Sequence, residues 1–358
     1  MSEPRPLISR SLVQLTLVRF RDFVRQPEAV FWTFGFPVLL ALGLGLAFRS
    51  RGPEQASVAV LAGNGGNAAV EQIRSALAAD STLRVQVLDD SGAVRELRTG
   101  KIALVVIPAP SPRDGSVEYM YDPQRSESRT ARLVVDQALQ QAAGRTDPVR
   151  VKDRTITERG SRYIDFVIPG LLGMNLMGSG IWGIGFAIVD SRSKRLLKRL
   201  MATPMSRAEF LMSFLFSRLF FLVLEVLALV GFGALVFGVP LRGPLVDLGI
   251  ICLVSALAFG ALGLLIASRA KTIEGVSGLM NLVMLPMWIF SGVFFSSSNF
   301  PDVVQPLIKI LPLTAAIDAL RANMLEGTAI SGLGAEMAIV SGWLVVSFFA
   351  ALRLFRWR

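Results

Sequence analysis

Ionisable side chains inside apolar stretches are the first candidates for chemistry in this sequence. Glu225 is the clearest of them, because it follows Leu224 in a long apolar run. A charge at the centre of a bilayer costs at least about 2.5–3.5 kcal/mol, so Glu225 should face protein or water, or be neutral. Arg218 falls on the same helical face, but about 10 Å away along the helix axis. Glu225 is therefore either a polar point on a substrate path or a structural contact to another helix or subunit.

The residue types that most hydrolytic and metal-dependent chemistry needs are missing. The sequence contains no histidine, which excludes Ser-His-Asp and Cys-His catalysis, histidine-ligated haem and almost any zinc site. The one cysteine, Cys252, lies in an apolar run and is interpreted as a packing residue. No intrachain disulfide can form, so any extracytoplasmic segment must be held together by its own core.

Three short glycine motifs match known signatures without the context that those signatures require. The pair Gly100-Lys101 has arginine and isoleucine where a P-loop needs glycine and Ser or Thr, which indicates that this chain does not bind ATP through a Walker A loop. Residues 178–183 match GxGxxG inside an apolar run, where close packing of helices is the favoured interpretation. Residues 275–278 match the GxSG of intramembrane serine proteases, which also need a histidine base.

Six apolar runs define the elements that must hold these residues. Of the 358 residues, 52% are hydrophobic and 18% are charged. The apolar residues gather in runs of about 20 residues, the length that crosses a hydrocarbon core of about 30 Å. The runs are 31–48, 164–189, 219–239, 245–267, 276–295 and 333–352. The first run is followed by no small-residue cleavage site and is interpreted as an uncleaved span. The sequence predicts a polytopic α-helical membrane protein with six transmembrane helices.

The segment between the first two runs changes character and predicts a small α/β domain. Strands are expected at 57–61, 84–88, 102–107 and 117–121. Helices are expected between them, at 68–79, 93–98 and 126–143. Alternation of strand and helix is typical of an α/β fold, and about 110 residues can form an independent core.

Two other segments flank or interrupt the spans. Residues 1–27 are basic, and an imperfect amphipathic pattern there favours a helix on the membrane surface over a simple charged tail. Residues 296–332 are too polar to cross a bilayer and contain three prolines that would break a long helix. One or two short helices that dip into the outer leaflet are expected in this second segment.

Basic residues mark the side of the membrane on which each loop lies. The net charge is +10, from 37 Lys and Arg against 27 Asp and Glu. Lys and Arg gather in residues 1–27, in 192–207, in 269–271 and in the tail, whereas the short loops of the other side hold Arg242, Lys309 and Arg321. The positive-inside rule then places both termini in the cytoplasm and the α/β domain outside. This distribution explains the basic balance without nucleic acid.

The loop 190–209 is the most informative soluble stretch on the predicted cytoplasmic side. Its basic residues alternate with Leu196, Leu197, Leu200 and Met201. A short amphipathic helix of this kind could dock onto another protein. The alternative, a solvated loop that only fixes topology, explains the charges but not the leucines.

At this point the sequence resembles the membrane subunits of type-2 ABC exporters. The first matching segment is 190–207, where a charged stretch runs into Thr203-Pro204. The second is 291–295, which starts with Ser291-Gly292 and is followed by Phe300-Pro301. The third is 311–321, which reads LPLT and ends in DALR. The 191–194 stretch departs from the family's frequent Glu-Arg-Gly-Thr type run. The large insertion is similar to that of one subgroup of the family.

The resemblance implies a division of labour between several chains. Two permeases pair, as two copies or as paralogues, and two separate ABC ATPase subunits carry ATP and Mg, so this chain itself needs no cofactor. The loop helix then couples to the ATPase. The candidate coupling residues are Arg192, Lys194, Arg195, Leu196, Leu197, Lys198, Arg199, Leu200, Met201, Thr203 and Pro204. The candidates for a substrate path are Glu225, Ser291 and Gly292.

The resulting expectation is a multi-pass permease of the bacterial inner membrane that is not itself an enzyme. It would export a hydrophobic or amphiphilic substrate, such as a drug or a lipid, by alternating access. The expected division is an amphipathic helix at 1–28, a first span at 29–49, an extracytoplasmic α/β domain at 50–162, and the other spans at 163–358, with a re-entrant segment at 296–325. The alternative is a membrane-anchored scaffold that uses the α/β domain without transport.

Overall fold

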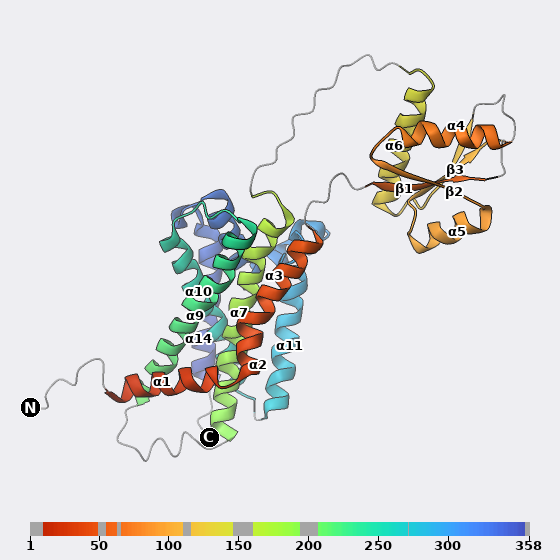
Figure 1. Cartoon of the computed structure of the whole chain (residues 1–358). Coiled ribbons are helices and arrows are strands. Elements are labelled where there is room, and N and C mark those ends of the chain that lie inside the picture. Colours follow the sequence, from red (N-terminus) through yellow and green to blue (C-terminus); the bar gives the residue numbers. More distant parts are fainter. Residues whose placement is uncertain are drawn as a thin grey trace, which may run out of the picture. The chain divides into compact units, whose positions relative to one another are not determined.

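The structure is a computed structural model, and it describes residues 10–48, 55–62, 66–109, 116–145, 160–193, 207–270 and 272–354. The chain divides into two compact units. One contains residues Met1–Arg49 and Ile156–Arg358, and the other contains Ser50–Thr155. The first is a helix bundle and the second is a small α/β domain (Figure 1). This confirms the fold predicted from the sequence.

Six helices in the described part of the chain are long and apolar enough to cross a membrane, which confirms the predicted number. The candidate spans are Pro27–Ala47, Tyr163–Val189, Ser217–Phe237, Leu245–Ala267, Ile273–Phe290 and Gly334–Leu354. The second and third belong to longer helices, α7 (Tyr163–Ser193) and α9 (Arg207–Phe237), and the last three are α10 (Leu245–Ala267), α11 (Ile273–Phe290) and α14 (Gly334–Leu354). The protein is therefore a multi-pass membrane protein.

Helices α7 and α10 form the centre of the bundle. More than half of each of these spans is buried, at 56% and 61%, whereas the other four spans are at most 28% buried. A glycine pair brings the two helices together. A Cβ on Gly180 would lie 2.7 Å from the Cβ of Phe259, and a Cβ on Gly263 would lie 2.7 Å from the carbonyl oxygen of Ile181. Within the motif at 178–183, Gly180 is thus the close-packing glycine, while Gly178 and Gly183 face open space.

A helix that runs across the bundle precedes the first span. This helix, α1 (Arg10–Val24), lies at the end of the bundle where α7 ends, α9 begins and α14 ends (Figure 1). The chain then turns at Arg25 and Gln26 into α2 (Pro27–Val30), a π-helical turn η1 (Phe31–Gly35) and α3 (Phe36–Ala47). Pro27 begins α2 because the first helical position does not need a backbone N–H.

The segment between α11 and α14 covers the other end of the bundle with short elements. They are a 3-10 turn η2 (Ser297–Asn299), α12 (Gln305–Ile310), α13 (Pro312–Arg321), a π-helical turn η3 (Ala322–Glu326) and a 3-10 turn η4 (Ile330–Gly332). Pro306 and Pro312 stand in the first turns of α12 and α13, so these prolines start helices. Eight of the ten residues of α13 are buried, which satisfies its backbone within protein.

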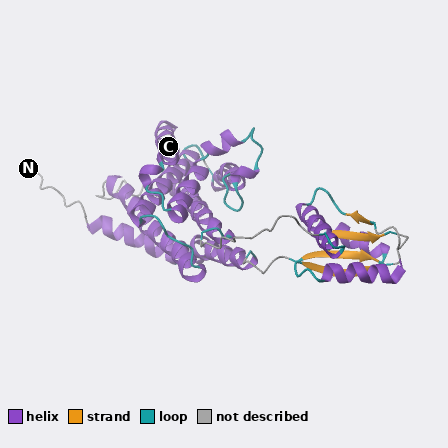
Figure 2. Cartoon of the chain, turned by 90° about the horizontal axis from the view of Figure 1, so that it is seen from above, coloured by secondary structure: helices purple, strands orange, loops and turns teal. Residues whose placement is uncertain are grey.

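The α/β unit is a four-stranded sheet with helices on both faces (Figure 2). The strands are β1 (Ala56–Leu61), β2 (Leu83–Leu88), β3 (Leu104–Pro108) and β4 (Val117–Met120), in the order β2-β1-β3-β4. The strand β1 pairs in parallel with β2 and β3, and β4 is antiparallel to β3. The helices are α4 (Gly66–Ala78), α5 (Asp90–Thr99) and α6 (Ser126–Ala142).

Alternation along the strands gives this unit two hydrophobic layers. Val58 and Val60 point to the face that α4 and α6 cover, where they pack with Leu77 and Val135. Ala59 points to the opposite face, which α5 covers. Successive side chains of a strand point to opposite faces, so one short strand contributes to both layers. The unit therefore has its own core and no need of a disulfide.

Candidate functional site

The coupling residues expected from the sequence lie at and beyond the end of α7. The backbone of Arg192 belongs to the last turn of α7. Lys194, Arg195, Leu196, Leu197, Lys198, Arg199, Leu200, Met201, Thr203 and Pro204 lie outside the described residues. The chain is described again from Arg207, where α9 begins. The coupling helix thus stays a prediction. Its residues lie in the sequence between the end of α7 and the start of α9.

Helix α1 is joined by an aromatic cluster to the part of α9 where the third candidate span begins. The ring of Phe23 lies 4.3 Å from that of Phe221, and the ring of Phe20 lies 5.8 Å from Phe221 and 5.3 Å from Phe220, centroid to centroid. Aromatic pairs at this spacing stabilise a contact by about 0.5–1.5 kcal/mol beyond their buried area. The amphipathic helix therefore uses its aromatic residues to pack on a span.

A buried ion pair with a bridging serine joins α9 to α7. Arg218 Nη1 donates to Glu225 Oε1 at 3.0 Å, and Arg218 Nη2 donates to Ser179 Oγ at 2.6 Å. Ser179 Oγ lies 2.9 Å from Glu225 Oε2 and 2.7 Å from the carbonyl oxygen of Asn175, so its one hydrogen has two acceptors. The Glu225 side chain is 1% exposed and that of Arg218 is 17% exposed.

The two side chains form an ion pair although their backbone positions are as far apart as the helix geometry predicts. Seven residues do separate the backbone of Arg218 from that of Glu225 by about 10 Å along the axis. The long arginine side chain covers that distance and neutralises the carboxylate. Burial of a single charge would be costly, and the pair with its serine satisfies most of the hydrogen-bonding groups. Arg218 Nε has no hydrogen-bond partner in the described part of the chain. A role of Glu225 in a substrate path stays a prediction.

At the opposite end of the bundle, Arg321 ties three segments together. Its guanidinium Cζ lies 3.6 Å from the ring centroid of Phe166 in α7. Nε and Nη2 both donate to the Phe166 carbonyl oxygen at 3.3 Å, and Nη2 also donates to the carbonyl oxygen of Gly292. Asp318, one turn earlier in α13, has Oδ1 4.0 Å from Nη1. One side chain thus connects α13, the first turn of α7 and the turn that follows α11.

The other two candidates for a substrate path belong to this same turn. Gly292 has φ +75°, which favours glycine, and this conformation presents its carbonyl to Arg321. Ser291 is fully buried, and its hydroxyl has no hydrogen-bond partner among the described residues. The structure therefore brings Ser291 and Gly292 together near Arg321, whereas Glu225 belongs to the cluster between α7 and α9. The three candidates belong to two different sets of contacts, and their role in a substrate path stays a prediction.

Asp165 is a carboxylate in the first turn of α7. Its side chain is fully buried, and Arg162 Nη2 lies 2.8 Å from Asp165 Oδ1. Oδ2 accepts from Arg162 Nε and from the backbone N–H groups of Gly160 and Arg162. The reason is that α7 is central, so even its first turn is surrounded by protein. Asp165 fixes the entry of the chain into α7.

Two further hydrogen bonds fasten the segment between α11 and α14 to the spans. The backbone N–H of Ile330 donates to Asp247 Oδ2 at 2.9 Å, and the hydroxyl of Tyr163 donates to the Phe294 carbonyl oxygen at 2.9 Å.

The serine of the motif at 275–278 makes only a local bond in the described structure, since Ser277 Oγ donates to the Ile273 carbonyl oxygen at 2.7 Å. This is an ordinary helix contact rather than a catalytic one.

Sequence reasoning placed Arg321 among the charges of a loop and missed its internal contacts. The signal that could have pointed to it is the matching segment 311–321, which ends at this arginine. The pairing of Arg321 with Phe166 bridges 155 positions of the sequence. A local sequence pattern cannot predict a contact between residues so far apart in the sequence.

A protein-family model described as ABC-2 family transporter protein matches residues 28–355. This range begins in α2 and ends one residue after α14. It contains all six candidate spans, except for Pro27, the first residue of the first span. It excludes all of α1, which ends at Val24.

Three curated proteins are similar to this chain at low sequence identity, and each match covers only part of both sequences. Nodulation protein J of Bradyrhizobium diazoefficiens is 32% identical over 29% of this chain and 39% of its own length. The probable multidrug ABC transporter permease YbhS of Escherichia coli is 24% identical over 45% of this chain and 43% of its own length. The inner membrane transport permease YadH of Escherichia coli is 23% identical over 55% of this chain and 75% of its own length. The chain spans about two fifths of the length of the first of these relatives.

Proposed function

Because this chain belongs to the ABC-2 family of transporter proteins, we propose that it is the membrane subunit of an ATP-driven exporter. The observation that carries the proposal is the family match over residues 28–355, combined with a bundle of six candidate spans. The substrate is a hydrophobic or amphiphilic molecule, such as a drug or a lipid, which leaves the cytoplasm or the inner leaflet. Transport follows from alternation between inward- and outward-facing states.

A separate ABC ATPase supplies the energy and binds ATP and Mg. It docks on the segment from Arg192 to Pro204, between the ends of α7 and α9. Two features support this assignment. The segment alternates leucines with basic residues. It is also continuous with α7, a central helix of the bundle, so a movement of the segment displaces that span. Helix α1 packs on α9 through Phe221 and forms a second part of the docking surface.

A second permease, either another copy or a paralogue, completes the transporter. The exposed apolar faces of the outer spans support this pairing. Leu282 and Leu285 on α11 are 70% and 54% exposed, and Val346 and Phe349 on α14 are 64% and 60% exposed. Membrane lipid covers the part of these faces that the second permease leaves free.

The protein lies in the bacterial inner membrane with both termini in the cytoplasm. One end of the bundle holds α1, the end of α7 and the end of α14 (Figure 1), and in the sequence basic residues flank these three helix ends. The α/β unit is inserted between α3 and α7, whose adjoining ends lie at the opposite end of the bundle. This insertion makes the α/β unit extracytoplasmic.

The contacts of Arg321 supply an outer closure. In the state described by the structure, the guanidinium joins α13, α7 and the turn at Gly292, and Ser291 is buried beside that turn. Opening to the outside requires the release of these contacts. The segment of Ser291 and Gly292 then forms the exit, and Glu225 lies on the inner part of the path.

The experiment that tests this function is purification of the tagged protein from its native membrane in mild detergent, with co-purifying chains identified by mass. An ABC ATPase at about equal stoichiometry is the expected result. Its reproducible absence, with an envelope protein bound instead, would overturn the permease assignment. That outcome would favour a scaffold in which the α/β unit is the functional part.

A further inference from the structure

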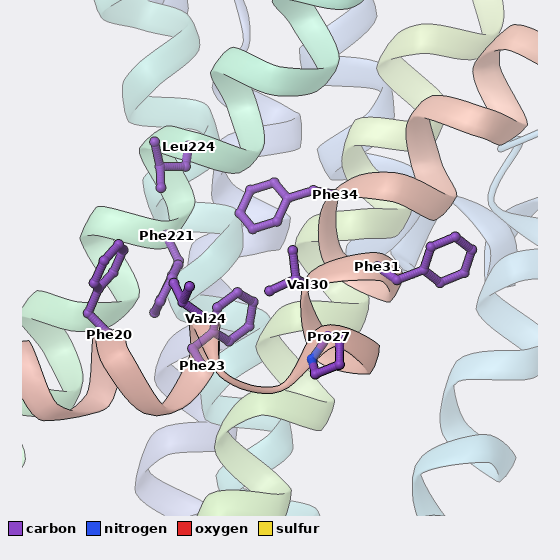
Figure 3. Close-up of a pocket in the computed structure, with 9 residues that line it drawn as sticks. All are labelled: Phe20, Phe23, Val24, Pro27, Val30, Phe31, Phe34, Phe221 and Leu224. Atoms are coloured by element: carbon purple, nitrogen blue, oxygen red, sulfur yellow. The ribbon is translucent and has the colours of Figure 1, made fainter.

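An apolar cavity of about 430 Å³ lies at the elbow between α1 and the first span (Figure 3). Phe20 and Phe23 contribute to it from α1, Val30 and Phe34 from the start of the first span, and Leu224 from α9. Every one of its lining side chains is apolar. The cavity therefore suits a hydrocarbon ligand and offers no side-chain hydrogen bond.

Aromatic contacts hold the cavity open. The ring of Phe23 lies 6.1 Å from that of Phe34 and 4.3 Å from that of Phe221, which forms the floor. Phe221 is only 9% exposed, whereas the rim residues Val24 and Phe31 are 53% and 45% exposed. The cavity thus has a rigid buried floor and an open mouth.

The surface around the mouth continues as an apolar face. Leu17 and Val18 on α1, Trp32 beside the rim, and Phe220 and Val223 on α9 are between 47% and 61% exposed. An apolar face on an outer span next to an amphipathic helix is in contact with acyl chains of the bilayer. A ligand can therefore enter the cavity sideways from the lipid phase.

Cationic side chains stand at the same elbow. Arg21 and Arg25 lie in the last turn of α1 and in the turn that follows it, and both are exposed. The exposed carboxylate of Glu28 is also near in sequence. Residues 1–30 carry five arginines against Glu3, Asp22 and Glu28. Basic residues of an amphipathic helix at the membrane surface attract anionic headgroups.

The apolar lining favours an acyl chain as the ligand. No lining side chain offers a hydrogen bond, and the mouth adjoins an apolar face on the outside of the bundle. An acyl chain needs no polar partner and can reach the cavity from the bilayer.

We propose that this cavity binds one acyl chain of an anionic glycerophospholipid whose headgroup lies against Arg21 and Arg25. The site is separate from the coupling segment and from the contacts of Arg218 and Arg321. The bound lipid joins α1, the first span and α9 into one unit. This inference does not depend on transport or on an ATPase.

Photolabelling of the full-length protein in phosphatidylcholine nanodiscs tests the site. The probes are phosphatidylglycerol and phosphatidylcholine with the same diazirine-bearing acyl chain, and labelled peptides are identified by mass spectrometry. The peptides that contain Phe23, Phe34 and Leu224 should be labelled about tenfold more by the anionic probe. Labelling of the exposed face of α14 should not differ between the two probes.

Matched variants separate the cavity from bulk lipid. Leu224→Trp fills the cavity and should lower its labelling about tenfold, the effect of excluding roughly two methylene groups. Val223→Trp, at the neighbouring exposed position that does not line the cavity, should leave labelling unchanged. Val30→Trp is a second filling variant should Leu224→Trp fail to give a monodisperse protein. Arg21→Gln with Arg25→Gln should abolish the preference for the anionic probe, and Arg269→Gln with Arg353→Gln should retain it.

Two outcomes would overturn the proposal. Equal labelling by both probes that Leu224→Trp does not reduce would identify ordinary annular lipid. Absence of cavity labelling, together with protein–protein crosslinks from a photoreactive residue at position 30, would assign the cavity to a second permease or another protein.

Discussion

Arg321 stacks on Phe166, with 3.6 Å between the guanidinium Cζ and the ring centroid, although 155 positions separate the two residues. The same guanidinium donates to two backbone carbonyl groups that belong to Phe166 and Gly292. A planar guanidinium can stack and donate at once, which an ammonium group cannot do. The contact is therefore specific for arginine.

We expect Arg321→Lys to loosen the outer closure without loss of the fold. The loss of a charge-assisted hydrogen bond in a buried site costs about 1.5–3 kcal/mol, which corresponds to about a tenfold or larger shift in the closed population. A cysteine at buried Ser291, in a background with Cys252→Ala, reports this opening through its rate of maleimide labelling. Labelling should accelerate about tenfold in Arg321→Lys.

The matched control for this closure is Lys309→Gln. Lys309 lies on α12 in the same segment and is exposed, so its loss should leave the labelling rate unchanged. Equal acceleration in both variants would mean that general destabilisation of the segment, and not the contacts of Arg321, governs access to position 291.

The pair of Arg218 and Glu225 should behave as a coupled unit. Loss of one partner leaves an uncompensated buried charge and costs about 3–5 kcal/mol, whereas replacement of both by apolar residues is often neutral. We therefore expect Glu225→Leu to lower the thermal stability in detergent more than the double variant Arg218→Met with Glu225→Leu. Glu225→Gln should preserve the fold, because Arg218 keeps a hydrogen-bond partner even without its counter-charge. The amide oxygen can accept from Arg218, and the amide nitrogen can donate to Ser179 Oγ, whose hydrogen then goes to the Asn175 carbonyl oxygen.

A double-mutant cycle gives the decisive quantity for this pair. A coupling energy of about 1–3 kcal/mol is expected for residues in contact. Additive effects of the two single variants would contradict the ion pair. Normal stability of Glu225→Gln combined with loss of transport would assign the carboxylate a role in the substrate path.

The α/β unit shows which features of the fold local sequence patterns contain. Strands expected at 57–61 and 84–88 correspond to β1 and β2, which are Ala56–Leu61 and Leu83–Leu88. Helices expected at 68–79 and 126–143 correspond to α4 and α6. Alternation and helical periodicity are local properties, and short turns between the elements leave few alternatives.

The polar contacts of the bundle show what such patterns leave out. Arg218 was placed on the face of Glu225, but backbone spacing alone gave no ion pair, because it ignores the reach of a long side chain. Asp165 lies at the end of a span, and no local pattern indicates that protein surrounds its side chain. The burial of a helix end depends on which helix becomes central, and this is decided by packing between distant segments.

The coupling segment can be tested through its leucines. Leu197→Asp or Leu200→Asp places a charge on the apolar side of the predicted helix and should abolish stimulation of the partner ATPase while membrane insertion stays intact. The measurement is the ATPase rate of the reconstituted complex with and without the permease variant. Leu241→Asp is the matched control, since Leu241 is 38% exposed in the loop between α9 and α10. Normal stimulation in both leucine variants would refute the coupling assignment.

Tyr119 makes the stability of the α/β unit depend on pH in the alkaline range. Its hydroxyl donates to Asp136 Oδ1 at 3.2 Å. Burial, with the neighbouring charge of Asp136, raises the pKa of Tyr119 from 10.0 to about 12. Because the folded unit holds this proton more tightly than the unfolded chain, the stabilisation is fully present below pH 10 and is lost as the pH rises through about 12.

The titration of Tyr119 can be followed by the ultraviolet absorbance of the phenolate, as the difference between the wild type and Tyr119→Phe. We expect the difference signal to have its midpoint near pH 12. Asp136→Asn removes the negative charge beside the hydroxyl, so it should move this midpoint toward lower pH. A midpoint near 10 that Asp136→Asn does not change would show that neither burial nor the carboxylate acts on Tyr119, and would contradict the packing of β4 against α6.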